Sequence, residues 1–278
     1  MKIAVIQLNS SDDKKSNIAR ALSFVESAIQ HQARFIVLPE VFNYRGKINT
    51  RKKLQSIAEH LPGKSTAPFL KIARRNKVFI LAGSIYEKIG NSNKVYNTSG
   101  LIYPSGKVCV RYRKIHLFDA LIGKKVVKES ALFRAGRKLA FGCVDEFSVG
   151  LSICYDLRFP EIYREYARKG AHILCVPSAF TKMTGKTHWE VLLRARAVEN
   201  LCYVVAANQI GCDARGIEAF GHSLIVNPWG EVIARASADK EEVIFAEISM
   251  ETLRDKRKIF PSAILNPRIL DDAYCDNF

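Results

Sequence analysis

The chain contains the stretch Val149-Gly-Leu-Ser-Ile-Cys-Tyr-Asp-Leu-Arg-Phe-Pro-Glu161, which decides its fold. Residues 149–153 are short and apolar, and they predict a buried strand. Pro160 is tolerated in a first helical turn, and residues 161–168 follow an amphipathic helical pattern. Cys154 therefore lies on a strand-to-helix bend, as the nucleophile of an elbow does, although the familiar elbow carries serine between glycines. Free cysteines are often simply buried, so this stretch alone leaves the role of Cys154 open.

Two other segments place a charged residue at the end of a predicted strand. The apolar run 35–38 ends at Pro39, so Glu40 follows at the edge where open α/β sheets bind ligands. Residues 108–113 alternate like a strand, and Lys114 comes where the pattern stops. Taken singly, Glu40 would be interpreted as a solvated or capping acid, and Lys114 would be interpreted as a surface lysine. Together with Cys154 they indicate a functional site.

These segments resemble the signatures of a known family. Leu-Pro-Glu40, Tyr-Arg-Lys114-Ile-His and Ile-Cys154-Tyr-Asp-Leu-Arg-Phe-Pro-Glu are similar to the three motifs of the nitrilase, or carbon–nitrogen hydrolase, superfamily, in the same order. The similarity extends over residues 3–260. The tract 177–211 most resembles the Nit branch of amidases, which includes deaminated glutathione amidase and ω-amidase.

The resemblance implies an α/β fold of one domain, a four-layer αββα sandwich formed by residues 1–260. Residues 261–278 are expected to form a C-terminal tail at a dimer interface, because tails cross to the partner subunit in this family. Homodimers are the family's common unit. The strand and helix patterns agree with a layered α/β fold, with hairpins over 98–113 and 223–234.

Physical chemistry gives the three residues distinct roles. Cys154 is the nucleophile, and a free thiol with a pKa of about 8.5 needs a base near neutral pH. Glu40 is expected to be that base. The ammonium of Lys114 would stabilise the thiolate and, with the backbone N–H of Tyr155, the oxyanion of the tetrahedral intermediate. The result is an acyl-enzyme that water cleaves to the free acid.

A fourth catalytic candidate is Glu129, which aligns with a second glutamate of the family that positions lysine, substrate or water. The alternative is a loop glutamate paired with Lys125 or Lys128. This alignment is complicated by the basic insert 121–125. Two acids beside one lysine are expected to differ in protonation, because like charges disfavour joint ionisation.

Substrate contacts are predicted from the positions of basic and hydroxyl side chains. A polar, flexible loop is expected over 180–186, past the buried strand 173–176. If the substrate carries a carboxylate, residues of this loop or two arginines near the motifs would bind it. Arg158 is more readily explained by a pair with Asp156 or Glu161 that fixes the bend. The candidates are Lys182, Thr184, Lys186, Arg45 and Arg158.

Composition indicates a cytoplasmic enzyme. The chain has 278 residues, 48% of them hydrophobic, and no low-complexity linker, which fits one large core. No apolar run reaches 18 residues, so no membrane span is expected. The seven cysteines are odd in number and show no C-x-x-C pair, and the six histidines show no ligand spacing. The sequence therefore predicts a reducing compartment, no metal and no cofactor.

The net charge of +16 favours a rival interpretation, because 43 basic residues against 27 acidic ones attract polyanions. The basic clusters are scattered, however, and are not interleaved with aromatic residues. The Gly-Lys-Ser and Gly-Lys-Thr triplets at 63–65 and 185–187 lack the earlier glycine of a phosphate-binding loop. Nucleic-acid binding is therefore disfavoured.

The prediction is a hydrolase that opens a carbon–nitrogen bond of a small amide bearing a carboxylate or an α-keto acid. The family resemblance places deaminated glutathione amidase activity first and ω-amidase activity second. Hydrolysis of N-carbamoyl amides and nitrilase chemistry are less favoured alternatives. A non-catalytic, polyanion-binding protein on the same scaffold is the alternative of a different class, and it is disfavoured because no member of the trio is replaced.

Overall fold

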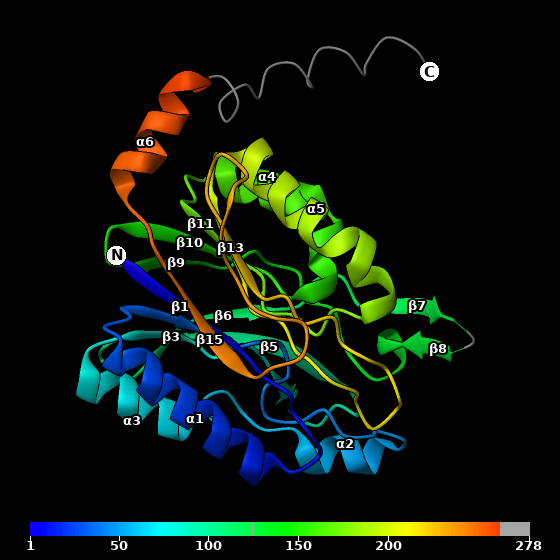
Figure 1. Ribbon diagram of the computed structural model, residues 1–278. Helices are drawn as coiled ribbons and strands as arrows, with labels where there is room; N and C mark the ends of the chain where they lie inside the picture. Colours follow the sequence, from blue (N-terminus) through cyan, green and yellow to red (C-terminus); the bar gives the residue numbers. More distant parts are fainter. Residues whose placement is uncertain (124, 262–278) are drawn as a thin grey trace, which may run out of the picture.

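Two β-sheets form the centre of the molecule, shown as a computed structural model in Figure 1. The structure describes residues 1–123 and 125–261. In the first sheet the strands follow the order β15-β1-β2-β3-β5-β4, and β6 also pairs with β5. Strands β1, β2 and β3 run parallel to one another. The strands of this sheet are β1 (Lys2–Gln7), β2 (Phe35–Val37), β3 (Phe79–Leu81), β4 (Ile85–Lys88), β5 (Val95–Ile102), β6 (Val108–Arg113) and β15 (Glu242–Glu247).

The second sheet has six strands in the order β14-β13-β12-β11-β10-β9. Its central strands β10, β11 and β12 are parallel, and the outer ones pair antiparallel. The predicted hairpins are confirmed, since β5 pairs with β6 and β13 with β14. The strands of this sheet are β9 (Phe141–Val144), β10 (Phe147–Leu151), β11 (Ile173–Cys175), β12 (Tyr203–Ala206), β13 (Leu224–Val226) and β14 (Val232–Arg235).

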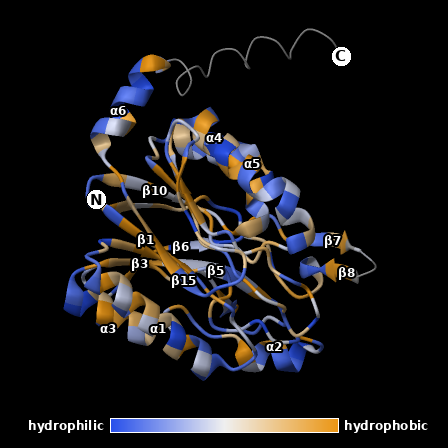
Figure 2. Cartoon of the chain, viewed as in Figure 1, coloured by the Kyte–Doolittle hydropathy of each residue, from blue (hydrophilic) through white to orange (hydrophobic). Residues whose placement is uncertain are grey.

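The two sheets pack face to face through one apolar layer. Alternate residues of each strand point to opposite faces, so Ile3 and Val5 of β1 enter this layer, whereas Ala4 and Ile6 face the helices. The second sheet contributes Val149 and other residues of β10, β11 and β12 to the same layer. Figure 2 shows the resulting apolar centre between the sheets.

Helices cover the outer faces of the sheets. Helices α1 (Lys14–Gln30) and α3 (Ala67–Asn76) pack on the first sheet, and α4 (Pro160–Arg168) and α5 (Lys182–Asn200) pack on the second (Figure 1). Trp189 of α5 is fully buried in the core between this helix and the second sheet. The predicted four-layer αββα sandwich is therefore confirmed.

Some elements were not predicted from the sequence. They are α2 (Arg51–Ile57), β4, β9 and the hairpin formed by β7 (Asp119–Ile122) and β8 (Lys125–Lys128). The expected flexible loop over 180–186 is wrong. The Thr181 hydroxyl accepts a hydrogen bond from the Thr184 N–H, so it caps a helix that already begins at Lys182.

The C-terminal part of the described chain is α6 (Met250–Ile259), which extends away from the sheets (Figure 1). The predicted tail lies almost entirely outside the described residues, so the domain boundary at 260 stays a prediction. Within the described ranges, no helix combines the length and apolar character needed to cross a membrane.

Candidate active site

Cys154 lies directly after β10, at the start of the 3-10 helix η2 (Cys154–Arg158) that leads into α4. Its φ angle is 48°, a value that residues other than glycine seldom adopt, and such strain is concentrated at functional sites. The Cys154 N–H donates to the Pro177 carbonyl at 2.9 Å, which fixes the bend against the end of β11. The bend thus has the strained geometry of a nucleophile elbow.

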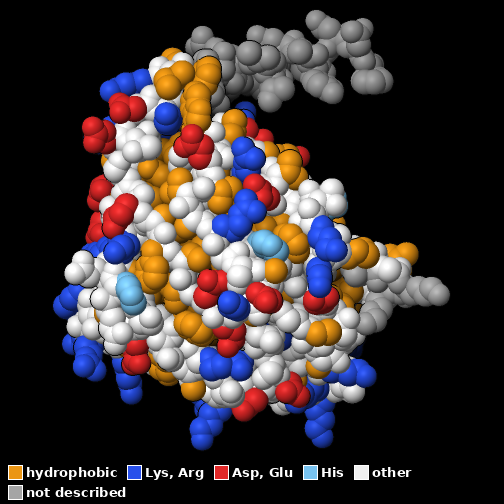
Figure 3. Space-filling view, viewed as in Figure 1, with side chains coloured by type: hydrophobic (Ala, Val, Ile, Leu, Met, Phe, Trp, Pro, Cys, Tyr) orange, Lys and Arg blue, Asp and Glu red, His pale blue; other side chains and the backbone are white. Residues whose placement is uncertain are grey.

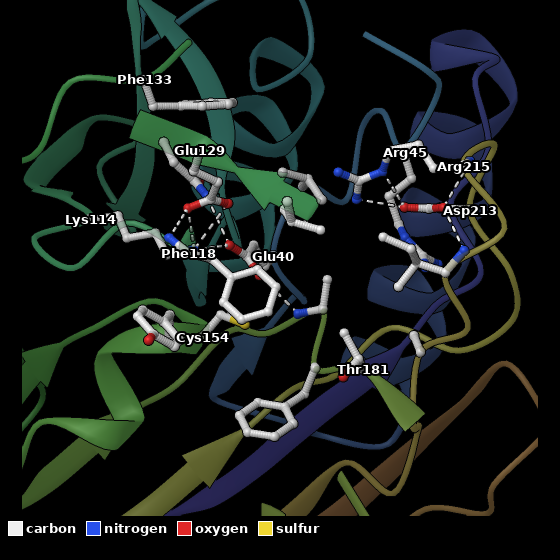
Figure 4. A pocket seen from close by; sticks show the side chains of 18 of the residues that line it. Glu40, Arg45, Lys114, Phe118, Glu129, Phe133, Cys154, Thr181, Asp213 and Arg215 are labelled. Atoms are coloured by element: carbon white, nitrogen blue, oxygen red, sulfur yellow. Dashed lines mark hydrogen bonds and ion pairs between the residues drawn. The ribbon is translucent and has the colours of Figure 1, made fainter. Parts of the chain in front are cut away.

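Glu40 follows β2 at the same edge of the molecule and is almost fully buried. Its Oε1 accepts a hydrogen bond from the Asn97 amide at 2.8 Å, and its Oε2 accepts one from the Ala179 N–H at 2.9 Å. Lys114 Nζ lies 3.1 Å from the same Oε1. These three donors hold the carboxylate in one orientation beside the thiol (Figure 4).

Lys114 is the cation between two acids. It is 1% exposed, and its Nζ lies 3.0 Å from Glu129 Oε2 as well as 3.1 Å from Glu40. Glu129 begins the 3-10 helix η1 (Glu129–Ala131), and its Oε2 also accepts from the Phe118 N–H at 2.7 Å. Glu129 therefore joins the cluster of Glu40, Lys114 and Cys154 (Figure 4), as the aligned family position led us to expect.

The electrostatics of the cluster favour a neutral thiol and a charged lysine. Burial and the Glu40 carboxylate raise the pKa of Cys154 well above its usual value, although Lys114 acts in the opposite sense. Burial lowers the pKa of Lys114, but Glu129 and Glu40 outweigh it and raise that pKa well above normal. Burial, with a smaller repulsion from Glu40, raises the pKa of Glu129. Removing the thiol proton therefore requires a base next to it.

The cluster lies at the wall of a cavity of about 520 Å³, a volume typical of small-molecule sites. Tyr155, Arg158, Thr184 and Arg45 line the cavity, so it brings these predicted contacts to the cluster. Lys182 and Lys186 are exposed and lie outside the lining, and Lys182 instead pairs with Glu218 at 2.6 Å. The beginning of α5 at Lys182 turns these two side chains away from the cavity.

Residues 2–258 match the family of carbon–nitrogen hydrolases. The chain belongs to this family. It is 38% identical over 261 residues to the human protein "Omega-amidase NIT2", covering 94% of this chain and 92% of that protein. It is 40% identical over 269 residues to "Deaminated glutathione amidase" of Synechocystis, covering 93% and 95%. The crystal structure of Saccharomyces cerevisiae Nit3, of branch 10 of the nitrilase superfamily, matches with a TM-score of 0.83 and 33% identity over 94% of both chains.

The comparisons confirm the predicted family, fold and enzyme class. This carbon–nitrogen hydrolase has relatives that are named amidases. Within the described residues, no group of three or more His, Cys, Asp or Glu side chains has an arrangement that fits a metal ion.

A buried acid that the sequence reasoning did not assign holds the elbow of this carbon–nitrogen hydrolase in place. Asp156 is fully buried, and its Oδ1 accepts from the N–H and the Nδ1 of His116 at 2.9 and 2.8 Å. Its Oδ2 accepts from the Tyr112 hydroxyl at 2.7 Å and from the Ile153 N–H at 2.9 Å. Through these hydrogen bonds Asp156 connects Tyr112 and His116, which lie on either side of Lys114 in the sequence, to Ile153, which precedes Cys154.

The predicted pair between Arg158 and Asp156 or Glu161 is wrong. Arg158 Nη1 lies 3.1 Å from His188 Nδ1 of α5, and its guanidinium lies 5.1 Å from the centre of the Phe180 ring. The four donors described above already satisfy Asp156. Arg158 therefore packs against α5 at the wall of the cavity.

Proposed function

We propose that this carbon–nitrogen hydrolase cleaves the amide bond of small, carboxylate-bearing amides through a thioester on Cys154. The observation that carries the proposal is the meeting of Cys154, Glu40 and Lys114 at one wall of a cavity, from three distant points of the chain. Acyl transfer needs a nucleophile, a base beside it and a positive charge near the developing oxyanion. The Cys154 thiol on its strained bend, the Glu40 carboxylate and the buried Lys114 ammonium are such groups.

In the acylation step Glu40 takes the Sγ proton as the sulfur attacks the amide carbon. The negative charge passes to the carbonyl oxygen, where the Lys114 ammonium and the Tyr155 N–H stabilise it. The carbon–nitrogen bond then breaks, and the proton held by Glu40 goes to the leaving nitrogen. Ammonia or an amine leaves, and the acyl group stays on Cys154 as a thioester.

In the deacylation step a water molecule replaces the amine. Glu40 takes a proton from this water, whose oxygen attacks the thioester carbon, and the same groups stabilise the second oxyanion. The carbon–sulfur bond breaks, the proton returns to Cys154, and the free acid leaves. Glu129 keeps Lys114 oriented in both steps, since its carboxylate accepts hydrogen bonds from both the Lys114 Nζ and the Phe118 N–H.

The amidase relatives support both leading activities, because relatives with both names match at similar identity. We keep deaminated glutathione amidase activity first and ω-amidase activity second, which is the order that the family resemblance of the motifs gave. N-carbamoyl amides and nitriles follow as weaker candidates. In the view of Figure 3 the basic side chains are interspersed with acidic ones, which does not favour the polyanion-binding alternative.

An ammonia- and amine-release screen tests the proposal. Its substrates are deaminated glutathione, the α-keto acid amide derived from glutamine, carbamoyl amino acids and nitriles. We expect turnover of the first two, and intact-mass spectrometry of a rapid quench should show an acyl adduct. Cys154→Ala should abolish both, whereas the matched variant Cys109→Ala, at an exposed thiol of β6, should retain both. Turnover that survives in Cys154→Ala would contradict the proposal.

We further propose that the enzyme is a cytoplasmic homodimer. Free thiols, three of them exposed outside the site at residues 109, 143 and 212, suit a reducing compartment. Exposed apolar side chains near the start of the tail, among them Val198, Trp229 and Phe260, suit a subunit interface. Sedimentation equilibrium of the wild type and of Trp229→Ser tests the dimer, which should weaken in the variant.

A further inference from the structure

Charged residues are divided between two sides of the cavity. Figure 4 shows Glu40, Lys114, Glu129 and Cys154 on one side and Arg45, Asp213 and Arg215 on the other. On the second side, Asp213 accepts from Arg215 Nε and Nη2 at 2.8 and 2.6 Å. Asp213 is almost fully buried, so this pair fixes the Arg215 guanidinium at the wall.

Arg45 is different, because among the described residues only backbone carbonyls accept hydrogen bonds from its buried guanidinium. It is 7% exposed, and its guanidinium donates to the Ile210 carbonyl at 2.7 Å and, over 3.4 Å, to the Gly211 carbonyl. Among the described residues no carboxylate forms an ion pair with it, and Asp213 is engaged by Arg215. Burial lowers the pKa of Arg45, and Asp213 offsets this only in part. A buried cation in this situation is stabilised by an anion that enters the cavity.

Tyr86 supplies a neutral donor on the same lining. Its ring packs on Phe133, and burial raises the pKa of its hydroxyl, so the phenol keeps its proton. Arg45 and Arg215 line the same cavity as Tyr86. Two guanidinium groups and a phenol are donors that suit a carboxylate.

We propose that Arg45, with Arg215 and Tyr86, forms a subsite for the carboxylate of the substrate's acyl half. This inference rests on the proposed function. When the leaving group is ammonia, only the acyl half extends from Cys154 toward Arg45. The carboxylate then stays bound in the thioester, so the subsite acts in acylation and in deacylation. The subsite therefore selects substrates whose acyl half ends in a carboxylate, whether ammonia or an amine leaves.

The other predicted contacts are less suited to this role. Arg158 lies against His188 and the Phe180 ring, and Lys182 is neutralised by Glu218 at the surface. We therefore expect Arg45 to determine the preference for substrates that carry a carboxylate on the acyl half.

The test compares three amides that place the carboxylate differently. Glutaramate carries it on the acyl half, pentanamide lacks it, and N-pentanoylglycine carries it on the leaving half. Replacing Arg45 with methionine removes the charge and keeps the length. We expect Arg45→Met to lower kcat/KM for glutaramate roughly 10- to 100-fold, as for a lost charge-assisted hydrogen bond. Pentanamide and N-pentanoylglycine should change by less than about threefold.

Further variants separate recognition from structure. Arg215→Met should show a smaller loss with the same selectivity, and Arg45→Lys should lie between wild type and Arg45→Met, because lysine keeps the charge without the fork. Arg75→Met, at an exposed position of α3, should match the wild type with all three amides. Equal losses for glutaramate and pentanamide, or a loss confined to N-pentanoylglycine, would overturn the subsite.

A binding measurement decides the subsite independently of turnover. Glutarate is titrated calorimetrically into Cys154→Ala and into Cys154→Ala combined with Arg45→Met. We expect the second protein to bind glutarate at least about tenfold more weakly. Unchanged affinity overturns the subsite. A wild-type protein that hydrolyses none of the amides contradicts the proposed function instead, and the titration still answers the question about Arg45.

Discussion

Replacing Asp156 with asparagine should loosen the elbow, because this carboxylate accepts four hydrogen bonds from three residues. An asparagine keeps one accepting oxygen and turns an NH₂ group toward the other donors. In its best orientation the NH₂ faces the Tyr112 hydroxyl, which can rotate and accept. The Ile153 N–H then has no acceptor.

The energetic cost follows from this arrangement. A buried N–H without an acceptor costs about 1–3 kcal/mol, and the loss of charge assistance at the remaining bonds adds about 1 kcal/mol. Asp156→Asn should therefore lower the free energy of unfolding by about 2–4 kcal/mol, measured by urea denaturation. Ile153 precedes Cys154, and a displacement of the nucleophile by about 1 Å lowers the rate on the order of 100-fold. We therefore expect kcat to fall by up to about 100-fold, with little change in KM.

A surface variant provides the control. Asp145 pairs with Arg34 at 2.6 Å, with both side chains about one third exposed. Asp145→Asn should cost no more than about 1 kcal/mol, since exposed ion pairs contribute little, and should leave kcat unchanged. If Asp156→Asn behaved like Asp145→Asn in both measurements, the argument that Asp156 positions the elbow would be refuted.

Other outcomes follow from the same structure. Lys114→Met should lower kcat/KM by about 10²- to 10³-fold in initial-rate assays, because it removes an oxyanion donor, whereas Lys182→Met at the surface should not. Asn97→Ala should lower kcat/KM about tenfold, because it removes one donor to the general base. Although burial raises the pKa of Glu59, the hydrogen bond from Lys14 helps to lower it overall, so its stabilisation exists above about pH 4.5 and is lost as pH falls. Urea denaturation at pH 7 and at acidic pH should therefore show a smaller loss of stability in Glu59→Gln than in the wild type.

The sequence predicted the elements whose local signals agree with their environment. Strands β1, β2 and β10 are short apolar runs ended by proline or a polar residue, and they are buried on both faces. Glu40 and Cys154 follow β2 and β10, so predicting these strands also predicted where the two side chains emerge. The family motifs then related them to each other.

The sequence failed where the decisive contact comes from a distant segment. The polar character of residues 180–186 predicted a loop, yet α5 already begins at Lys182. A Cβ at position 185 of this helix would meet the Phe220 ring, so close packing requires Gly185. The partners of Arg158 and Asp156 were wrong for a similar reason. His188, Tyr112 and His116 come from other elements, and the nearest opposite charge in the sequence is not the nearest in space.

The site depends on how the two sheets are held together. Glu40 and Lys114 extend from strands of the first sheet, and Cys154 extends from the second, so a sliding of one sheet over the other would separate base from nucleophile. The buried Gln209 opposes this motion at the same edge. It forms a bridge with Leu8 after β1, and its amide donates to the Glu40 carbonyl at 2.9 Å. Because an error of about 1 Å in such a geometry costs on the order of 100-fold in rate, the contacts that join the sheets also set the catalytic geometry.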